Sequence, residues 1–323
     1  MQKIAILCSG GDVSGMNPAL KRFVEYSKAK GLRPYFVQNG FEGLIDNEIY
    51  EAGYSDVTGI ISRGGTKIRS ARSARFMELA YRKQALDNLK SHDISYLVIL
   101  GGDGSFKGMQ LLGDESEGIG FSGIPSTIDN DIAGTEYCLG VDTALNTIRC
   151  AIDSIRDTAS SFSRAFVVEV MGRECGYLAL VSALTSGAEM CLIPEIPYEL
   201  DDYKTCFQKQ MGEGREYFIA VVSEALKNSE QIAQWFEDEI GVESRITVLG
   251  HIQRGGNPTV YDRLMAFNFV THAIDGLLEG KRSSVVCYSK GGFNHKKIED
   301  VSFKQYQMNE DMLKVGAEFG SKR

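Results

Sequence analysis

Two carboxylates, Asp129 and Asp131, stand two positions apart in the segment 125–131, which reads PSTIDND. The apolar stretch from Gly118 to Ile124 that precedes them predicts a buried strand. A second strand is predicted from Tyr96 to Leu100, and it ends in GGDGS. We expect these strand ends to meet, so that one holds a phosphate donor and a metal. The other would then supply the carboxylate that activates an acceptor hydroxyl.

The GGDGS segment places Asp103 between glycines at the carboxyl end of a strand. An aspartate in this position can approach a metal-bound polyphosphate, while the N-terminus of the next helix faces the phosphates. The alternative is an aspartate that only caps a helix in a tight turn. A second glycine-rich turn, SGGDVSGMN, follows the predicted strand from Lys3 to Cys8. Because two strands of the chain end in glycine-rich turns, phosphate binding is the favoured interpretation. The chain has neither a GxxxxGK[ST] P-loop nor a GxGxxG dinucleotide turn after a strand.

Phosphoryl transfer needs a metal on the donor, cations around the transferring group and a carboxylate that takes the acceptor's proton. Asp103 suits the metal, and Asp129 and Asp131 are both candidates for the base. Two nearby carboxylates repel each other unless a cation or hydrogen bonds share the site, so one of them can serve mainly to orient the other or the metal. The TIDND segment can also form only an Asx-type turn, but its position after a strand favours catalysis.

Cationic side chains suited to phosphate stand at the starts and ends of predicted strands in the second half of the chain. They are Arg164, Arg173, Arg245 and Arg254, with His251 three residues before Arg254. Each alone is more typical of a surface salt bridge, but together they predict a phosphate-binding cluster. Glu224, after a predicted strand at Tyr217–Val222, can accept hydrogen bonds from sugar hydroxyls.

Strand and helix patterns alternate along the chain, which predicts parallel sheets with helices on both faces. In the second half we expect strands at Ala165–Val170, Met190–Ile193, Tyr217–Val222 and Arg245–Leu249, and helices at Ala144–Thr158, Tyr177–Ser186, Asp201–Met211, Gln231–Ile240 and Tyr261–Leu278. Ten or so strands are many for one sheet, so the α/β chain is expected to form two domains of similar architecture. The tail from about Lys290 to Arg323 is polar and charged, and its residues indicate no chemistry.

Composition limits the partners of this 323-residue chain. The net charge is −8 and the sequence pI is near 5.2, which argues against nucleic acid or an anionic membrane as the main partner. No apolar run approaches the roughly 20 residues of a membrane span, and the N-terminus lacks a signal-peptide pattern. The 7 cysteines include no CxxC pair, which indicates reduced thiols in a cytoplasmic protein.

Six motifs together resemble the bacterial-type 6-phosphofructokinase family, in order and at the family's spacing from Lys3 to about Gly280. They are GGDVSGMN, SRGGT, GGDGS, PSTIDND, VEVMGRECGYLA and VLGHIQRGGNPTVYDR. The resemblance implies transfer of a phosphoryl group from ATP to the 1-hydroxyl of fructose 6-phosphate with Mg²⁺. It also implies a cytoplasmic, allosteric homotetramer whose active sites are shared between subunits, with two doubly wound α/β/α domains per subunit. The ATP-binding domain would comprise 1–138 plus 252–303, and the fructose 6-phosphate-binding domain 139–251 plus 304–323.

The resemblance also assigns roles to individual residues. ATP would contact Gly11, Arg72, Ser73, Gly102, Asp103, Gly104 and Ser105, with Asp103 on magnesium. Asp129 would be the base, with Thr127 and Asp131 beside it, and Arg173 would stabilise the transferring group. Fructose 6-phosphate would bind Thr127, Ile128, Asp129, Met171, Gly172, Arg173, Glu224, His251, Ile252, Gln253 and Arg254, joined by Arg164 and Arg245 of a neighbouring subunit.

Two departures from the family pattern leave questions open. Family members that use ATP commonly have glycine where this chain has Ser126, and pyrophosphate users have lysine; Gly104 follows the ATP pattern. In the effector site, Lys21, Arg156, Glu189 and Arg215 fit, but Glu25, Tyr54, Glu213 and Tyr217 replace cationic or imidazole groups. We therefore expect weakened regulation by ADP and phosphoenolpyruvate. The alternatives are a pyrophosphate-dependent enzyme, a kinase of a related sugar phosphate such as tagatose 6-phosphate, and a catalytically silent ligand-binding protein.

Overall fold

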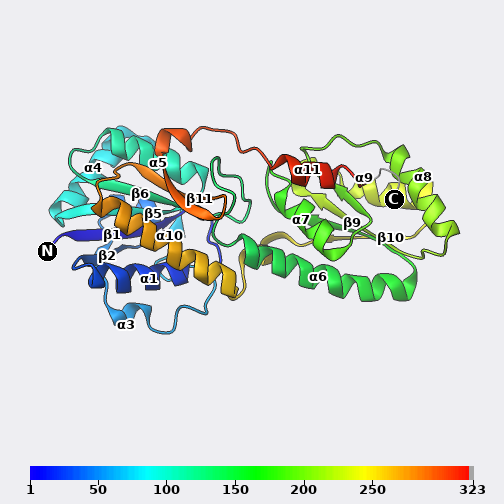
Figure 1. Ribbon diagram of the computed structural model, residues 1–323, viewed down its shortest axis with the longest axis horizontal. Helices are drawn as coiled ribbons and strands as arrows, with labels where there is room; N and C mark the ends of the chain where they lie inside the picture. The colour runs from blue at the N-terminus through cyan, green and yellow to red at the C-terminus, as the bar shows by residue number, and fades with distance from the viewer. Residues whose placement is uncertain (320–323) are drawn as a thin grey trace. The chain divides into compact units, whose positions relative to one another are not determined.

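Near-continuous apolar runs form the central strands of two separate sheets in residues 1–319, the part of the chain that a computed structural model describes (Figure 1). Strands of this composition are typical of parallel sheets that are covered on both faces. Each sheet belongs to one compact unit. The first unit is Met1–Thr143 with Arg254–Tyr306, and the second is Ala144–Gln253 with the described residues from Gln307 to Phe319. The predicted α/β class with mainly parallel sheets is confirmed.

The boundaries of these units differ slightly from those expected of the two domains. The divisions lie after residues 143, 253 and 306, where the sequence analysis put them after 138, 251 and 303. Residues 320–323 of the expected second domain lie outside the described residues.

The sheet of the first unit has 8 strands in the order β12-β11-β6-β5-β1-β2-β3, with β4 paired to β1. Only the edge strands β3 and β12 are antiparallel to their neighbours. The strands are β1 (Lys3–Ser9), β2 (Arg33–Val37), β3 (Ile49–Glu51), β4 (Ser70–Ala71), β5 (Ile94–Gly101), β6 (Gly120–Pro125), β11 (Ser284–Ser289) and β12 (Gly292–Lys297).

Helices cover both faces of this sheet. Figure 1 shows α1 and α10 side by side on one face, with α4 and α5 on the other. The helices are α1 (Met16–Ala29), α2 (Gly40–Ile45), α3 (Tyr54–Val57), η1 (Arg75–Met77), α4 (Leu79–Ser91), α5 (Asp103–Asp114), α10 (Val260–Leu278) and η5 (Ile298–Asp300). Helix α6 (Val141–Phe162) begins in this unit and continues into the second.

The second unit contains a 4-stranded parallel sheet in the order β10-β7-β9-β8. Its strands are β7 (Ala165–Val170), β8 (Met190–Leu192), β9 (Phe218–Ser223) and β10 (Ser244–Val248). Its helices are α7 (Tyr177–Ser186), α8 (Leu200–Gly212), η2 (Glu224–Leu226), α9 (Ser229–Trp235), η3 (Phe236–Ile240) and α11 (Glu310–Gly316), and η4 (Gly250–Arg254) ends at the first residue of the other unit. The predicted helix over 231–240 is thus a shorter α-helix followed by a π-helical turn.

The segment after Lys281 holds structure that the sequence pattern did not reveal. Strands β11 and β12 form a hairpin around Lys290 and Gly291, both with positive φ, as a two-residue type I′ turn requires. Strand β12 is a largely polar edge strand, so it lacks an apolar pattern. Helix α11 adds a further turn of structure near the end of the described chain. Within residues 1–319, no helix combines the length and the apolar character needed to cross a membrane.

Candidate active site

The two glycine- and aspartate-rich strand ends lie side by side in the first unit. Strands β5 and β6 are parallel neighbours with Gly101 opposite Pro125. The backbone N–H of Ser126 donates to Gly101 O at 2.9 Å, which keeps the chains together just beyond the sheet. A Cβ on Gly102 would lie 3.7 Å from Thr127 Cβ. The expectation that these two strand ends meet is confirmed.

Asp103 is the first residue of α5, so its carboxylate lies at the positive end of the helix dipole. Its Oδ2 is 2.5 Å from Nζ of Lys107, one helical turn later. The ammonium group also lies 5.1 Å from the ring centre of Phe303. Next to Asp103, a Cβ on Gly104 would meet no atom within 4 Å. The start of α5 therefore offers a carboxylate, a cation and free space for a ligand.

The end of β1 is fastened to this region from the other side. Ser105, which is buried, donates a hydrogen bond from Oγ to Ser9 Oγ at 2.9 Å. Ser105 thus connects two strand ends, and its hydroxyl does not face solvent. Gly11, two residues after β1, lies against the guanidinium group of Arg254. A Cβ on Gly11 would be 2.0 Å from Arg254 Nη1, so only glycine allows this approach.

The loop after β6 carries the predicted base. Asp129 is fully buried, and its backbone N–H donates to Thr127 Oγ1 at 3.2 Å. Ile128 is also buried, whereas Asp131 is half-buried. Asn130 adopts φ 53°, in the left-handed region, and its side chain holds the loop in place: Nδ2 donates to Glu136 O and Oδ1 accepts from Cys138 N. The loop is thus a fixed support for Asp129.

Ser126 is 2% exposed, and its Oγ donates to Ile124 O at 3.1 Å. The hydroxyl is therefore bonded to the backbone of its own strand. A small, neutral side chain in this arrangement adds neither charge nor bulk beyond the strand end.

The basic segment around Arg72 follows the second glycine pair. Arg72 is exposed, and Ser73 Oγ accepts from Phe76 N at 3.1 Å. Upstream, the side chain of Asn17 donates to Arg63 O and Gly64 O. These bonds attach the segment to the start of α1 and leave Arg72 accessible.

In the second unit, the loop after β7 carries Met171, Gly172 and Arg173. Glu224, at the carboxyl end of neighbouring β9, accepts from Gly172 N at 3.1 Å and Arg173 N at 2.9 Å through its Oε1. Buried Gln253 accepts from Met171 N and donates to Gly250 O. Glu224 and Gln253 therefore hold the loop that presents exposed Arg173, a role that the sequence analysis did not predict for them.

The arginines of this unit do not form one cluster. Arg164 precedes β7 and pairs with Glu243 at 2.7 Å, and Arg245 at the start of β10 pairs with the same carboxylate. Hydrogen bonding to Arg164 is the main cause that lowers the pKa of Glu243. Arg173 lies beyond the opposite end of the parallel strands, on the side where His251 and Ile252 are exposed in η4. Within one chain the expected single cluster is therefore wrong, because strand starts and strand ends lie at opposite edges of a parallel sheet.

The four effector-site candidates each make a contact within their own unit. In α1, Lys21 pairs with Glu25. In the second unit, Arg156 donates to Ser186 O and lies 5.8 Å from the ring centre of Tyr217. Glu189, whose side chain is 7% exposed, accepts from Ile219 N and pairs with Arg215. Burial raises the pKa of Glu189, and these contacts oppose the rise.

Sequence reasoning missed residues that act on the predicted ones. Lys107 was identifiable in principle, because its spacing of four from Asp103 is that of a helical ion pair. Asn130 was not predicted, and Glu224 and Gln253 were predicted as substrate contacts but not as residues that bind the backbone of a loop. No local sequence pattern indicates such contacts.

Comparisons with known proteins identify the family of the chain. A family model described as phosphofructokinase matches residues 3–277. A protein of Sulfurovum sp. (strain NBC37-1) named ATP-dependent 6-phosphofructokinase is 72% identical over 99% of this chain and 98% of its own length. One of the same name from Sulfurimonas denitrificans is 63% identical over 97% of this chain and 98% of its own length.

Solved structures show the same likeness. The phosphofructokinase of Saccharomyces cerevisiae superposes with a TM-score of 0.87 at 32% identity, covering 98% of this chain and 46% of that one. A pyrophosphate-dependent phosphofructokinase from Marinobacter aquaeolei superposes with a TM-score of 0.84 at 19% identity, covering 96% of this chain and 86% of that one. At this low identity the likeness shows only a shared fold. With a family model over most of its length and relatives this similar, the chain belongs to the phosphofructokinase family.

Proposed function

We propose that the chain transfers the γ-phosphoryl group of ATP to the 1-hydroxyl of fructose 6-phosphate, the committed phosphorylation of glycolysis. The structural observation that supports this most directly is the adjacency of two strand ends, one with Asp103 and the other leading to Asp129. The names of the relatives from Sulfurovum sp. and Sulfurimonas denitrificans support ATP and a 6-phosphosugar as the substrates.

The reaction breaks the bond between the γ-phosphorus and the β,γ-bridging oxygen and forms a bond from phosphorus to the sugar O1. The proton of the 1-hydroxyl passes to a carboxylate oxygen of Asp129. Asp131, two residues on, supports the base, and Thr127 Oγ1 fixes the backbone at Asp129. Arg173, presented by the Glu224-bonded loop, stabilises the charge on the transferring group.

Magnesium fits the start of α5. Mg²⁺ prefers oxygen ligands and is commonly held by one or two carboxylates together with substrate phosphates. Asp103 supplies one such carboxylate beside open space at Gly104, and its present partner, Lys107, is a flexible side chain that a metal ion can displace. Bound there, the metal would neutralise charge on the donor phosphates. Gly11, Arg72, Ser73, Gly102 and Ser105 complete the proposed ATP contacts.

Fructose 6-phosphate would bind Met171, Gly172, Arg173, Glu224, His251, Ile252 and Arg254, with Thr127, Ile128 and Asp129 from the base loop. We assign Gln253 to the same group through its support of Met171. Arg164 and Arg245, which share Glu243 at the starts of their strands, would serve a neighbouring subunit in a cytoplasmic homotetramer.

Ser126 does not favour pyrophosphate as the donor. Its bonded hydroxyl supplies no charge to replace a lysine, and Gly104 leaves room for a nucleotide. We also propose that allosteric control by ADP or phosphoenolpyruvate is weak, because Glu25 adds negative charge beside Lys21 in the first unit and Glu213 adds it beside Arg215 in the second.

One assay tests the proposed function. Purified enzyme is given fructose 6-phosphate with Mg²⁺ and either ATP or pyrophosphate, and tagatose 6-phosphate is tried as the second acceptor. We expect fructose 1,6-bisphosphate from ATP at a rate at least tenfold above that with pyrophosphate. A higher rate with pyrophosphate or with tagatose 6-phosphate would replace the proposal by the corresponding alternative, and no turnover would leave a ligand-binding protein.

A further inference from the structure

A buried carboxylate, Asp262, joins two segments of the first unit that are far apart in sequence. It lies in the first turn of α10 and is fully buried. Its Oδ1 accepts from Tyr137 Oη at 2.6 Å and from Gly140 N at 2.7 Å. Its Oδ2 accepts from Thr143 N at 2.8 Å and Thr143 Oγ1 at 2.6 Å. Four donors thus converge on one carboxylate.

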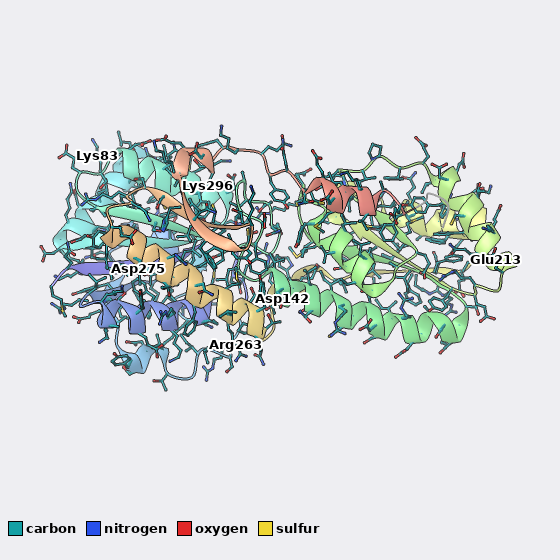
Figure 2. All side chains as sticks on the ribbon, in the orientation of Figure 1. Lys83, Asp142, Glu213, Arg263, Asp275 and Lys296 are labelled. Atoms are coloured by element: carbon teal, nitrogen blue, oxygen red, sulfur yellow. The ribbon has the colours of Figure 1, made fainter. Side chains whose placement is uncertain are left out.

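These bonds fix the start of α6 against the start of α10. Gly140 precedes α6, and Thr143 is in its first turn, so Asp262 satisfies backbone N–H groups that the helix itself cannot. A second hydrogen bond joins the same two helix starts, with the donor on the α10 side: Thr259 Oγ1, which caps α10, donates to Asp142 Oδ2 at 2.5 Å. Figure 2 shows Asp142 at the start of α6, beside the first turn of α10 that carries Arg263.

Through Tyr137, the same carboxylate reaches the loop that holds Asp129. The residues on either side of Tyr137 bind the side chain of Asn130: Glu136 O accepts from Nδ2 at 3.2 Å, and Cys138 N donates to Oδ1 at 2.9 Å. Asn130 directly follows Asp129. Two residues beyond Tyr137, Leu139 N donates to Pro125 O at 2.9 Å and closes the loop onto the end of β6.

We propose that Asp262 is a positioning residue that holds Asp129 in place by fixing Tyr137 and Gly140 at the far side of the loop. This inference rests on the proposed role of Asp129 as the base. Asp262 contacts no reacting atom; it acts through Tyr137 and Asn130. Small displacements of a catalytic group reduce the rate strongly, so the support matters for turnover.

The chemistry of the site requires a carboxylate. An ionised aspartate accepts hydrogen bonds at both oxygens and donates none, which matches four donors. Asparagine would turn an NH₂ group toward two of them and leave those donors without an acceptor. Burial, with the adjacent carboxylate, raises the pKa of Tyr137, so its hydroxyl remains a donor.

The chain contains a matched control for the removal of the Tyr137 hydroxyl. Tyr26 in α1 donates to Asp275 in α10 at 2.8 Å, so it forms the same kind of pair on the same helix. Asp275 lies farther along α10 than the Asp142 contact, as Figure 2 shows. Y137F and Y26F each remove one hydroxyl that donates to a carboxylate of α10, but only the first touches the loop with Asp129.

The experiment measures kcat and KM for both substrates and hydrogen exchange of a peptide covering 126–136, in wild type, Y137F and Y26F. Assays are run well below the Tm of each variant. We expect Y137F to lower kcat about tenfold, to change KM less than threefold and to speed exchange in that peptide. Y26F should leave kcat and the hydrogen exchange of this peptide unchanged, even if it lowers Tm by as much as Y137F does. D262N should act like Y137F and more strongly, and D275N like Y26F.

Several results would overturn the inference. Unchanged kcat in Y137F would do so, as would unchanged hydrogen exchange in 126–136. An equal loss of kcat in Y26F would also do so, because it would indicate a general loss of rigidity in the unit. Failure of the proposed function is distinguishable, because wild type would then show no phosphoryl transfer while the exchange data still report on the loop.

Discussion

The guanidinium group of Arg254 lies directly against the Cα of Gly11, at the turn after β1. A methyl group on Gly11 would come within 2.0 Å of Nη1, so G11A must displace this flexible side chain. Because Arg254 is a proposed contact of the sugar phosphate and Gly11 of ATP, we expect KM to rise roughly tenfold for fructose 6-phosphate and also to rise for ATP. Tm should barely change, since the group that moves is the end of a long side chain.

The matched control is G292A. A Cβ on Gly292 would meet nothing within 4 Å, and the residue lies in the edge strand β12. Steady-state kinetics should distinguish the two variants. Unaltered KM values in G11A would contradict the assignment of Arg254.

Removing the carboxylate of Asp129 should abolish most turnover. We expect D129S to lower kcat by roughly 10²–10⁴-fold, the usual contribution of a general base, with smaller changes in KM. D114S, at the exposed end of α5, is the control for loss of an aspartate. A variant at position 129 with near-normal kcat would show that another group takes the proton.

Much of this site was predictable because parallel strands end at a common edge. The positions of Asp103 and Asp129 after neighbouring strands follow from that rule. The same rule explains why Arg164 and Arg173 lie apart within one chain. Strand β7 has 6 residues between Arg164 and the loop with Arg173, a length of about 20 Å at the usual rise per residue.

Other contacts could not be predicted from local patterns. Asp262 and Tyr137 are 125 residues apart in sequence, and nothing near either residue indicates the pairing. Strand β12 was missed because an edge strand with polar residues has no apolar periodicity, whereas the buried run SVVCYS of β11 was visible in the sequence and was overlooked. Long-range polar contacts and edge strands depend on tertiary structure.

Gly104 should control the nucleotide without affecting folding. In G104D the new side chain would enter open space, so Tm should stay within a few degrees of wild type. The added carboxylate would stand beside Asp103 and the donor phosphates, and like charges repel. We expect KM for ATP to rise at least tenfold, as measured in initial-rate assays, whereas G104A should have a much smaller effect. Equal KM values for ATP in G104D and G104A would contradict this placement of the donor.

Ser126 should not affect whether the enzyme prefers ATP or pyrophosphate as the phosphoryl donor. Its hydroxyl is bonded to Ile124 O and its side chain is buried, so S126G removes no group that faces a ligand. We expect the ratio of ATP-dependent to pyrophosphate-dependent kcat/KM to change less than threefold. Loss of one hydrogen bond should lower stability by about 1 kcal/mol in denaturant unfolding. A tenfold shift in the donor ratio would instead give the serine a role in specificity.

Effector control should be weak because acidic side chains surround the candidate cations. Arg215 is paired with Glu189, and Glu213 and Glu216 line the same surface pocket. At an effective dielectric near 20, a glutamate beside a phosphate costs on the order of 1 kcal/mol or more, about a fivefold loss of affinity per contact. We expect hyperbolic saturation with fructose 6-phosphate that neither submillimolar ADP nor phosphoenolpyruvate alters at saturating ATP.

The charge argument predicts the effect of restoring a cation. E213K should make the enzyme measurably more sensitive to phosphoenolpyruvate, which is not a product of the reaction and so reports on a separate site. A lysine introduced at Asp311, an exposed acidic residue in α11, is the control for a change of net charge. Sigmoidal saturation of the wild-type enzyme that submillimolar ADP relieves would show that anions bind despite Glu25 and Glu213.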